Sequence, residues 1–244
     1  MSEMLDPKMV LGAYSVGVFP MADSRDAAGV YWVEPRRRAI LPLDAFRLSR
    51  SLRKTIVADR LKVTVDTAFD RVVELCAESV AGRPETWINP AIERVFHTLH
   101  TTGFAHSVEC WDGGKLVGGL YGLGLGRAFF GESMVSRATD ASKVALAHLV
   151  ARLRAGGFTL LDCQFQTSHL ASLGAVEIDR ATYVALLNAS LDGAAGAGAG
   201  SAAPSSAAGD FRALDRLAGA LAPAGVVSGP VDGTVIAQLL THTS

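Results

Sequence analysis

Two polar residues interrupt the otherwise apolar segment "TLLDCQF", which begins at residue 159. Because side chains alternate along a strand, Asp162 and Gln164 are expected to share one face, with the apolar residues on the other face. Burying a carboxylate and an amide without partners costs several kcal/mol. The face that carries them is therefore either a functional site or a polar network that satisfies itself.

A third polar residue lies in a similar setting. Glu132 stands in "FFGESM", flanked by Phe129, Phe130 and Met134. Carboxylates and an amide beside an apolar wall suit a pocket that orients a polar reacting group next to a hydrophobic side chain. The alternative is a buried polar network that helps to specify the core. From the residues alone both interpretations stay open.

Other kinds of site find little support in the sequence. The glycines of "GLYGLGLG" have the rhythm of a phosphate-binding loop, but they fall inside an expected strand instead of between a strand and a helix. Glycine there is expected to let another part of the chain come close. The six histidines lack metal-ligand spacing, and no Ser–His–acid arrangement is evident. We predict no metal and no cofactor.

Composition limits the protein class. The chain has 244 residues, a formal net charge of −1 and three well-separated cysteines without a CxxC motif. No apolar run approaches the roughly 20 residues of a membrane span, and the N-terminus lacks the pattern of a signal peptide. These features predict a cytoplasmic protein with reduced thiols and no membrane partner.

The near-neutral total hides a basic stretch. Seven Arg or Lys residues and a single acid, Asp44, lie between Arg36 and Lys54. The stretch is either a solvated face or a patch that contacts the phosphates of a nucleic acid. A neutral protein with one basic stripe suits local contact with RNA.

Hydrophobic periodicity predicts an α+β fold. Strands are expected at 61–69, 105–111, 115–126, 127–136 and 158–165, and helices at 69–78, 89–103, 141–157 and 168–174. The "DGG" between two of the strands indicates a hairpin. We divide the chain into a small N-terminal domain (1–62), a catalytic domain (63–190), an Ala/Gly/Ser-rich flexible linker (191–210) and a C-terminal helix and strand that pack back on the fold (211–244).

Several blocks, in order, resemble the bacterial leucyl/phenylalanyl-tRNA–protein transferases. They are "YSVGVFPM", "YWVEPRRRAILPLDAFRLSRSLRK", "TWI", "LHTTGFAHSVECW", "LVGGLYGLGLGRAFFGESMVS", "ASKVALAHL", "LLDCQF" and "HLASLGAVEIDR". The resemblance implies a small N-terminal domain and a C-terminal domain similar to GCN5-type acetyltransferases (GNAT). It also implies transfer of Leu, Phe or Met from aminoacyl-tRNA to proteins with N-terminal Arg or Lys, which marks them for N-end rule degradation. A monomer is expected.

The same resemblance implies roles for individual residues. Asp162 and Gln164 match the catalytic pair, and Glu132 matches a third polar residue of the active site. We interpret Gln164 as the residue that positions the attacking amine and Asp162 as the residue that orients Gln164. Glu132 is interpreted as the group that holds the cationic terminus of the acceptor.

Further positions match substrate-binding residues of the family. The donor side-chain pocket matches Leu120, Phe129, Met134, Leu149 and Leu161. The terminal adenosine of the tRNA is expected beside Trp87 and Met21, the latter replacing a tryptophan of some members. The tRNA acceptor stem is expected to contact Arg50, Arg53 and Lys54.

Two other functions remain as alternatives. An acyl-CoA-dependent N-acetyltransferase would need a glycine-rich diphosphate loop before the long helix, and "SRATDASKVAL" lacks those glycines. A non-enzymatic RNA-binding or adaptor module would leave Asp162, Gln164 and Glu132 free to change without loss of function.

Overall fold

A seven-stranded mixed sheet forms the centre of the computed structural model, which describes residues 5–78, 86–192, 208–221 and 230–241. In spatial order its strands are β4 (Lys62–Val65), β5 (Ala105–Asp112), β6 (Lys115–Leu125), β7 (Ala128–Ser136), β8 (Leu160–Gln164), β3 (Arg37–Ile40) and β9 (Val176–Asp179). Within this sheet β7 and β8 pair in parallel, and every other neighbouring pair is antiparallel. The expected mixed α+β class is confirmed.

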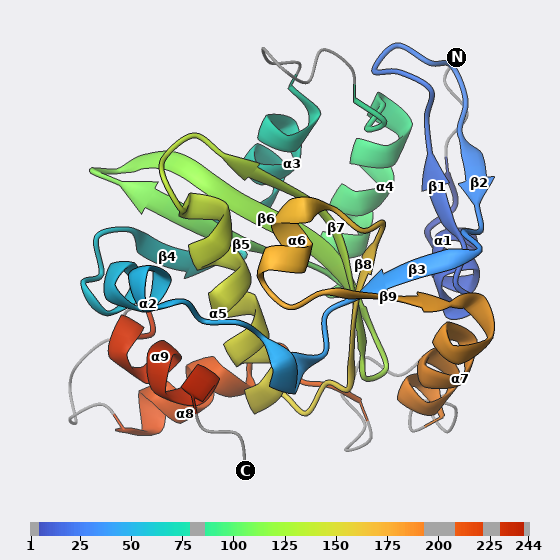
Figure 1. Cartoon of the computed structure of the whole chain (residues 1–244). Coiled ribbons are helices and arrows are strands. Elements are labelled where there is room, and N and C mark those ends of the chain that lie inside the picture. The colour runs from blue at the N-terminus through green and yellow to red at the C-terminus, as the bar shows by residue number, and fades with distance from the viewer. Residues whose placement is uncertain (1–4, 79–85, 193–207, 222–229, 242–244) are drawn as a thin grey trace.

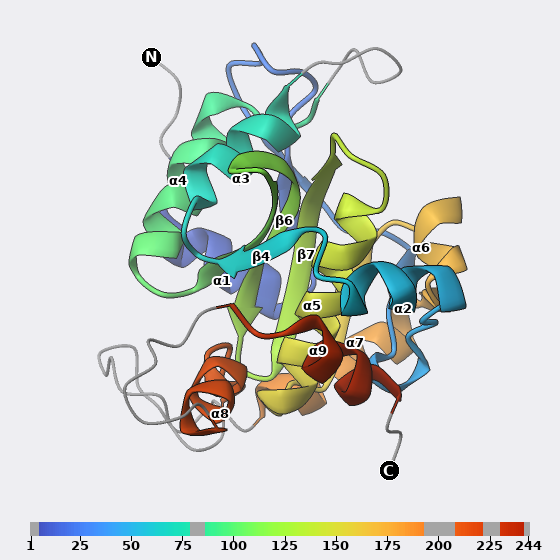
Figure 2. The same ribbon diagram turned by 90° about the vertical axis from the view of Figure 1, so that its left-hand side faces the viewer.

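Helices cover both faces of the sheet (Figures 1 and 2). One face carries α3 (Phe69–Ala77) and α4 (Pro90–Thr101), and α1 (Pro7–Ser15) packs against α4. The other face carries α5 (Ala141–Ala155), which contacts β5, β6 and β7, together with α2 (Arg50–Val57) and α6 (Ser168–Ser172). The remaining elements are β1 (Phe19–Met21), β2 (Tyr31–Val33), the 3₁₀ turn η1 (Leu43–Ala45), α7 (Arg180–Leu191), α8 (Ala213–Leu221) and α9 (Gly233–Thr241).

Local sequence explains why most of these elements form where expected. Helix α4 begins with Pro90, and the side chain of Asn89 accepts hydrogen bonds from the N–H groups of Ala91 and Ile92. The "DGG" hairpin is confirmed between β5 and β6, where Gly113 and Gly114 have φ of +52° and +82°. At Gly122 in β6, a Cβ atom would lie 2.4 Å from the Phe129 ring, so close packing requires the glycine.

The first 62 residues are divided between two places. A small N-terminal region, with α1 and the β1–β2 ribbon, stands beside the main sheet (Figure 1). Strand β3, however, lies inside the main sheet and pairs with both β8 and β9. This insertion places Arg38 directly beside β8. The domain boundary at residue 62 stays a prediction.

The end of the chain differs from the expectation. Residues 233–241 form helix α9, so the prediction of a final strand is wrong. Ile236, Ala237 and Leu240 are buried on one side of this helix, a helical spacing that outweighs the β-branched pair at its start. The expected helix after residue 211 is present as α8. Most of the predicted linker, 193–207, lies outside the described residues.

No helix in the described ranges combines the length and apolar character that crossing a bilayer requires. Cys76 and Cys110 are buried, Cys163 is half-buried, and none of the three forms a disulfide within the described residues.

Candidate active site

A cavity of about 300 Å³ opens where β6, β7 and β8 meet α5 and α6. Glu132 and Gln164 line it from adjacent strands, and Trp87 and His169 lie at its wall. The structure therefore brings together two of the three predicted catalytic residues in one hollow.

Asp162 does not share this hollow, contrary to the prediction from strand alternation. Within the described chain the β8 residues that line the cavity are Leu161, Cys163 and Gln164. The alternation ends because Gln164 has a left-handed backbone, with φ of +61°. Its N–H donates a 2.7 Å hydrogen bond to Asp162 Oδ1, which holds this turn in place. Gln164 thus faces the cavity while Asp162 faces the other side of the strand.

Asp162 is instead the acceptor at the centre of a buried ionic network. Its side chain is fully buried, and Arg38, itself 1% exposed, donates to both carboxylate oxygens at 2.6–3.0 Å. The hydroxyl of Tyr183 donates at 2.8 Å. The Arg38 guanidinium also lies over the rings of Phe19 and Tyr183 and donates to Gly17 O. The carboxylate is therefore fixed in orientation and well compensated for its burial.

Glu132 is held next to Gln164 in the cavity wall. Gln164 Nε2 donates a 2.9 Å hydrogen bond to Glu132 Oε1. Oε2 lies beyond direct hydrogen-bond distance of any described residue, and the buried hydroxyl of Tyr14, also without a direct partner, is close enough to lower the pKa of Glu132. Burial raises the pKa of Glu132 to about 8, although hydrogen bonding partly opposes this effect. A carboxylate that is costly to ionise without a partner is suited to receive a cation.

The apolar wall of the cavity contains four of the five predicted donor-pocket residues: Leu120, Met134, Leu149 and Leu161. Leu161 lines the cavity because it precedes Asp162 on β8, and neighbouring residues of a strand face opposite sides. Phe129 is fully buried and, in the described structure, stands behind the lining residues instead of among them.

The two residues expected near the terminal adenosine lie close in the chain trace. The N–H of Ala22, next to Met21, donates to Trp87 O at 3.1 Å. Trp87 lines the cavity, whereas Met21 packs against the neighbouring apolar core.

The basic stretch separates into different environments. Arg50, Arg53 and Lys54 are exposed on α2, at a spacing that places them along one face of the helix. Arg38, by contrast, is buried against Asp162, and Arg37 pairs with Glu177. The stripe is therefore narrower than the sequence indicates.

Sequence reasoning missed three residues of this region. Arg38 and Tyr183 form the network around Asp162, and His169 lines the cavity. A buried aspartate requires a cation, so a buried Arg was foreseeable. Three consecutive arginines, however, carry no signal that distinguishes the buried one.

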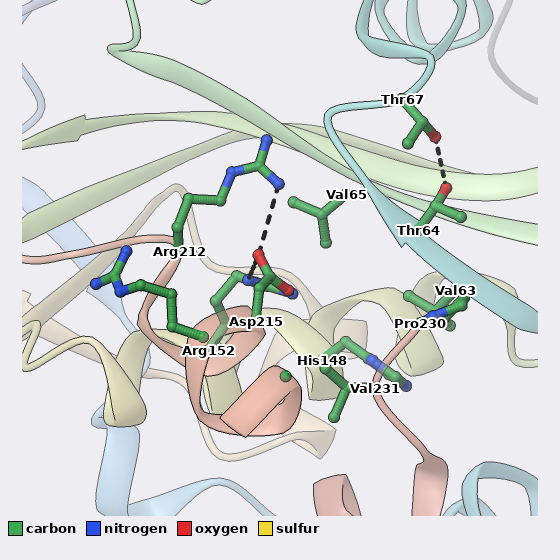
Figure 3. A pocket seen from close by; sticks show the side chains of 12 residues that line it. Val63, Thr64, Val65, Thr67, His148, Arg152, Arg212, Asp215, Pro230 and Val231 are labelled. Carbon is green, nitrogen blue, oxygen red and sulfur yellow. Dashed lines mark hydrogen bonds and ion pairs between the residues drawn. The ribbon is translucent and has the colours of Figure 1, made fainter. Parts of the chain in front are cut away.

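A second cavity, of about 610 Å³, lies between β4, α5 and α8 and is lined by Thr64, His148, Arg152, Arg212 and Asp215 among others (Figure 3). Among its lining residues in the described chain there is no predicted site residue. The described residues also include no group of three His, Cys, Asp or Glu side chains that could hold a metal ion.

Comparison with known proteins places these features in a class. The family model described as "Leucyl/phenylalanyl-tRNA protein transferase" matches residues 40–188, and its N-terminal domain model matches residues 3–36. The transferase of Rhizorhabdus wittichii is 62% identical, covering 98% of this chain and 99% of its own. That of Novosphingobium aromaticivorans is 50% identical, covering 98% and 97%.

The mixed sheet, the polar pair and these matches define an aminoacyltransferase. The chain belongs to the leucyl/phenylalanyl-tRNA protein transferase family. Among solved structures, it is similar to "The structure of L-PGS from Bacillus licheniformis", at 12% identity and a TM-score of 0.40 over 69% of this chain and 55% of that one.

Proposed function

We propose that this protein transfers Leu or Phe, and also Met, from aminoacyl-tRNA to the N-terminal Arg or Lys of acceptor proteins, which marks them for N-end rule degradation. The observation that carries the proposal is the Glu132–Gln164 hydrogen bond at the edge of an apolar cavity. A polar pair beside an apolar wall meets the need to hold a cationic acceptor and a hydrophobic donor side by side. The relatives are named leucyl/phenylalanyl-tRNA–protein transferases, which agrees with an aminoacyl-tRNA as donor and a protein as acceptor.

The donor binds with its side chain against Leu120, Met134, Leu149 and Leu161. Full burial of a Leu or Phe side chain contributes about 1.5–3 kcal/mol, whereas Ile or Val is rejected by its branched Cβ. The terminal adenosine lies beside Trp87 and Met21, and the acceptor stem lies along Arg50, Arg53 and Lys54.

The chemistry is aminolysis of an ester. The neutral α-amine of the acceptor attacks the carbonyl carbon of the aminoacyl ester. A C–N bond forms, the C–O bond to the ribose breaks, and the amine proton ends on the released ribose oxygen. Gln164 positions the amine through its side-chain amide, which is too weakly basic to remove a proton.

Asp162 acts through the backbone of Gln164. Its carboxylate, clamped by Arg38, accepts the Gln164 N–H and so fixes the left-handed turn that aims the amide at the cavity. Glu132 holds the cationic acceptor with Oε2 while Oε1 stays bound to Gln164.

Several finer assignments belong to the same proposal. The catalytic domain is of the GNAT type, supported by the parallel β7–β8 pair whose strands α5 connects. The small domain at 1–62, the monomeric state and the cytoplasmic location are also part of it, and three cysteines that form no disulfide among the described residues agree with that location.

The test is transfer of radiolabelled leucine from leucyl-tRNA to a peptide that begins with Arg, compared with one that begins with Ala. We expect label on the Arg peptide alone. No label on either peptide while tRNA still binds would leave an RNA-binding module and overturn the proposal.

Replacing Glu132 with Gln is expected to change how stability depends on pH. Because the folded pKa is about 8, above the ordinary value near 4.5, the stability contributed by the protonated form is complete below the unfolded pKa and is lost as pH rises through 8. The wild type should therefore lose stability relative to Glu132→Gln between pH 5 and pH 9, by a few kcal/mol.

Urea unfolding at several pH values measures this difference. Glu177→Gln, at an exposed ion pair, is the control and should give parallel pH curves. Parallel curves for Glu132→Gln as well would contradict the raised pKa. Transfer to the Arg peptide should fall in this variant because the amide cannot hold the acceptor cation.

Leu149→Phe is expected to fill the cavity and to shift the donor preference. Leu149 is 1% exposed and lines the apolar wall. The larger side chain should reduce transfer of Phe about threefold to thirtyfold more than transfer of Leu. Parallel assays with the two charged tRNAs measure the ratio of kcat/KM. The control is Leu153→Phe, one turn further along α5, which should lower both rates equally.

A further inference from the structure

The chain returns to the catalytic core after residue 207. The N–H of Gly209 donates to Gly126 O at 2.8 Å, and that of Asp210 donates to Gly156 O at 2.9 Å. Gly156 approaches so closely that a Cβ atom there would lie 2.3 Å from Asp210 O. This returning segment lies beyond residue 188, where the family match ends.

A buried arginine locks the segment in place. Arg152 on α5, 4% exposed, donates to both oxygens of Asp215 at 2.7 Å and to Phe211 O at 3.0 Å. Figure 3 shows Asp215 between Arg152 and Arg212. Arg212 also pairs with Asp66 at 2.7 Å. Side-chain and backbone contacts therefore fix Phe211 against the core.

Phe211 packs directly on Phe129. It is 4% exposed, and its ring stacks on Phe129 with centroids 5.6 Å apart and planes at 11°. The ring also stacks on His106, at 4.0 Å and 16°, and the Arg152 guanidinium lies over it at 5.3 Å from the centroid. Phe158 packs edge-on against Phe129, and the Phe129 ring lies so close to Gly122 that no Cβ atom would fit there. The position of the Phe129 ring therefore depends on Phe211.

Phe129 in turn supports the wall of the donor pocket. It pairs in register with Leu161 across the parallel β7–β8 contact. It belongs to the same apolar cluster as Leu120 and Leu149, which line the cavity. Phe129 thus connects Phe211, on which it stacks, with Leu161 of the pocket wall, beside which it lies in the sheet.

We propose that Phe211 is a specificity-determining residue that sets the depth of the donor side-chain pocket through Phe129. The inference rests on the proposed assignment of that pocket. In a close-packed interior, loss of the outer layer lets the next layer move outward. A deeper pocket favours the larger donor side chain.

Phe211→Ala and the milder Phe211→Leu test this role through the ratio of kcat/KM for Phe transfer to that for Leu transfer. We expect Phe211→Ala to raise the ratio about threefold to tenfold, with Phe211→Leu between it and the wild type. Assays run below the melting temperature of each variant. Ile236→Ala is the control. Ile236 is buried on α9, which packs on α2 and α5, so this variant weakens the C-terminal region at a different place and should leave the ratio unchanged.

An unchanged ratio in both Phe211 variants would overturn the proposal and reduce Phe211 to an anchor of the C-terminal segment. The same would follow if Ile236→Ala moved the ratio equally. Leu149→Phe separates this failure from failure of the pocket assignment. If that variant also leaves the ratio unchanged, the cavity is not the donor pocket, and both inferences fall.

Discussion

Arg38→Met is expected to lower the free energy of unfolding by about 3–5 kcal/mol, because it leaves the carboxylate of Asp162 buried without its cation. In the native protein, Arg38 donates to both oxygens of that carboxylate, and neither side chain is more than 1% exposed. The hydroxyl of Tyr183 cannot replace a charge. Urea unfolding at neutral pH measures the loss.

The companion variants show whether the cost comes from the unpaired charge. Arg38→Met combined with Asp162→Leu should recover much of the lost stability, since removing both partners restores an apolar interior. Arg37→Met, at an exposed ion pair with Glu177, should cost less than about 1 kcal/mol. Equal losses for Arg37→Met and Arg38→Met would contradict the network.

The double variant also separates folding from catalysis. Without Asp162 the N–H of Gln164 loses its acceptor, and the left-handed turn that aims the amide loses its support. We expect the folded double variant to bind aminoacyl-tRNA while its transfer rate falls at least tenfold, a loss of about 1.4 kcal/mol of transition-state stabilisation. Single-turnover transfer and filter binding measure the two quantities.

Replacing Arg50, Arg53 and Lys54 together with Ala is expected to weaken tRNA binding strongly at low salt. Three phosphate contacts on a duplex stem contribute about 2–3 to the slope of log K against log salt concentration. The slope should become shallower by that amount, and the affinities of variant and wild type should converge at high salt. Dissociation constants between about 50 and 200 mM salt provide the test.

A charge-matched control uses exposed cations elsewhere. Arg71, Lys115 and Arg137 lie on α3, on the β5–β6 hairpin and after β7. Replacing these three with Ala changes the net charge equally but should leave the slope close to that of the wild type. An unchanged slope in the α2 variant would move the tRNA site away from α2.

Much of the architecture could be predicted because it depends on local sequence. The "DGG" turn and the Asn89–Pro90 start of α4 are properties of short segments, and the structure contains both of them. The family could likewise be recognised from contiguous blocks such as "FFGESM" and "LLDCQF". The candidate catalytic residues were then predicted from matching positions, without knowledge of their geometry.

The geometry of β8 could not be predicted in this way. Ideal alternation puts Asp162 and Gln164 on one face, but a left-handed residue at the end of the strand breaks the period. The fixed carboxylate of Asp162 supports that conformation by accepting the N–H of Gln164. The carboxylate is fixed by Arg38, which lies 124 residues away in the sequence.

Short-range patterns in the sequence were sufficient to predict most local elements, the family and the residue types at the site. Tertiary structure decided which arginine of "RRR" is buried, that Leu161 lines the cavity, that residues 233–241 form a helix and that Phe211 packs behind Phe129. The physical reason is that burial and ion pairing depend on contacts between distant segments. The energies of these contacts exceed local preferences such as strand alternation and β propensity.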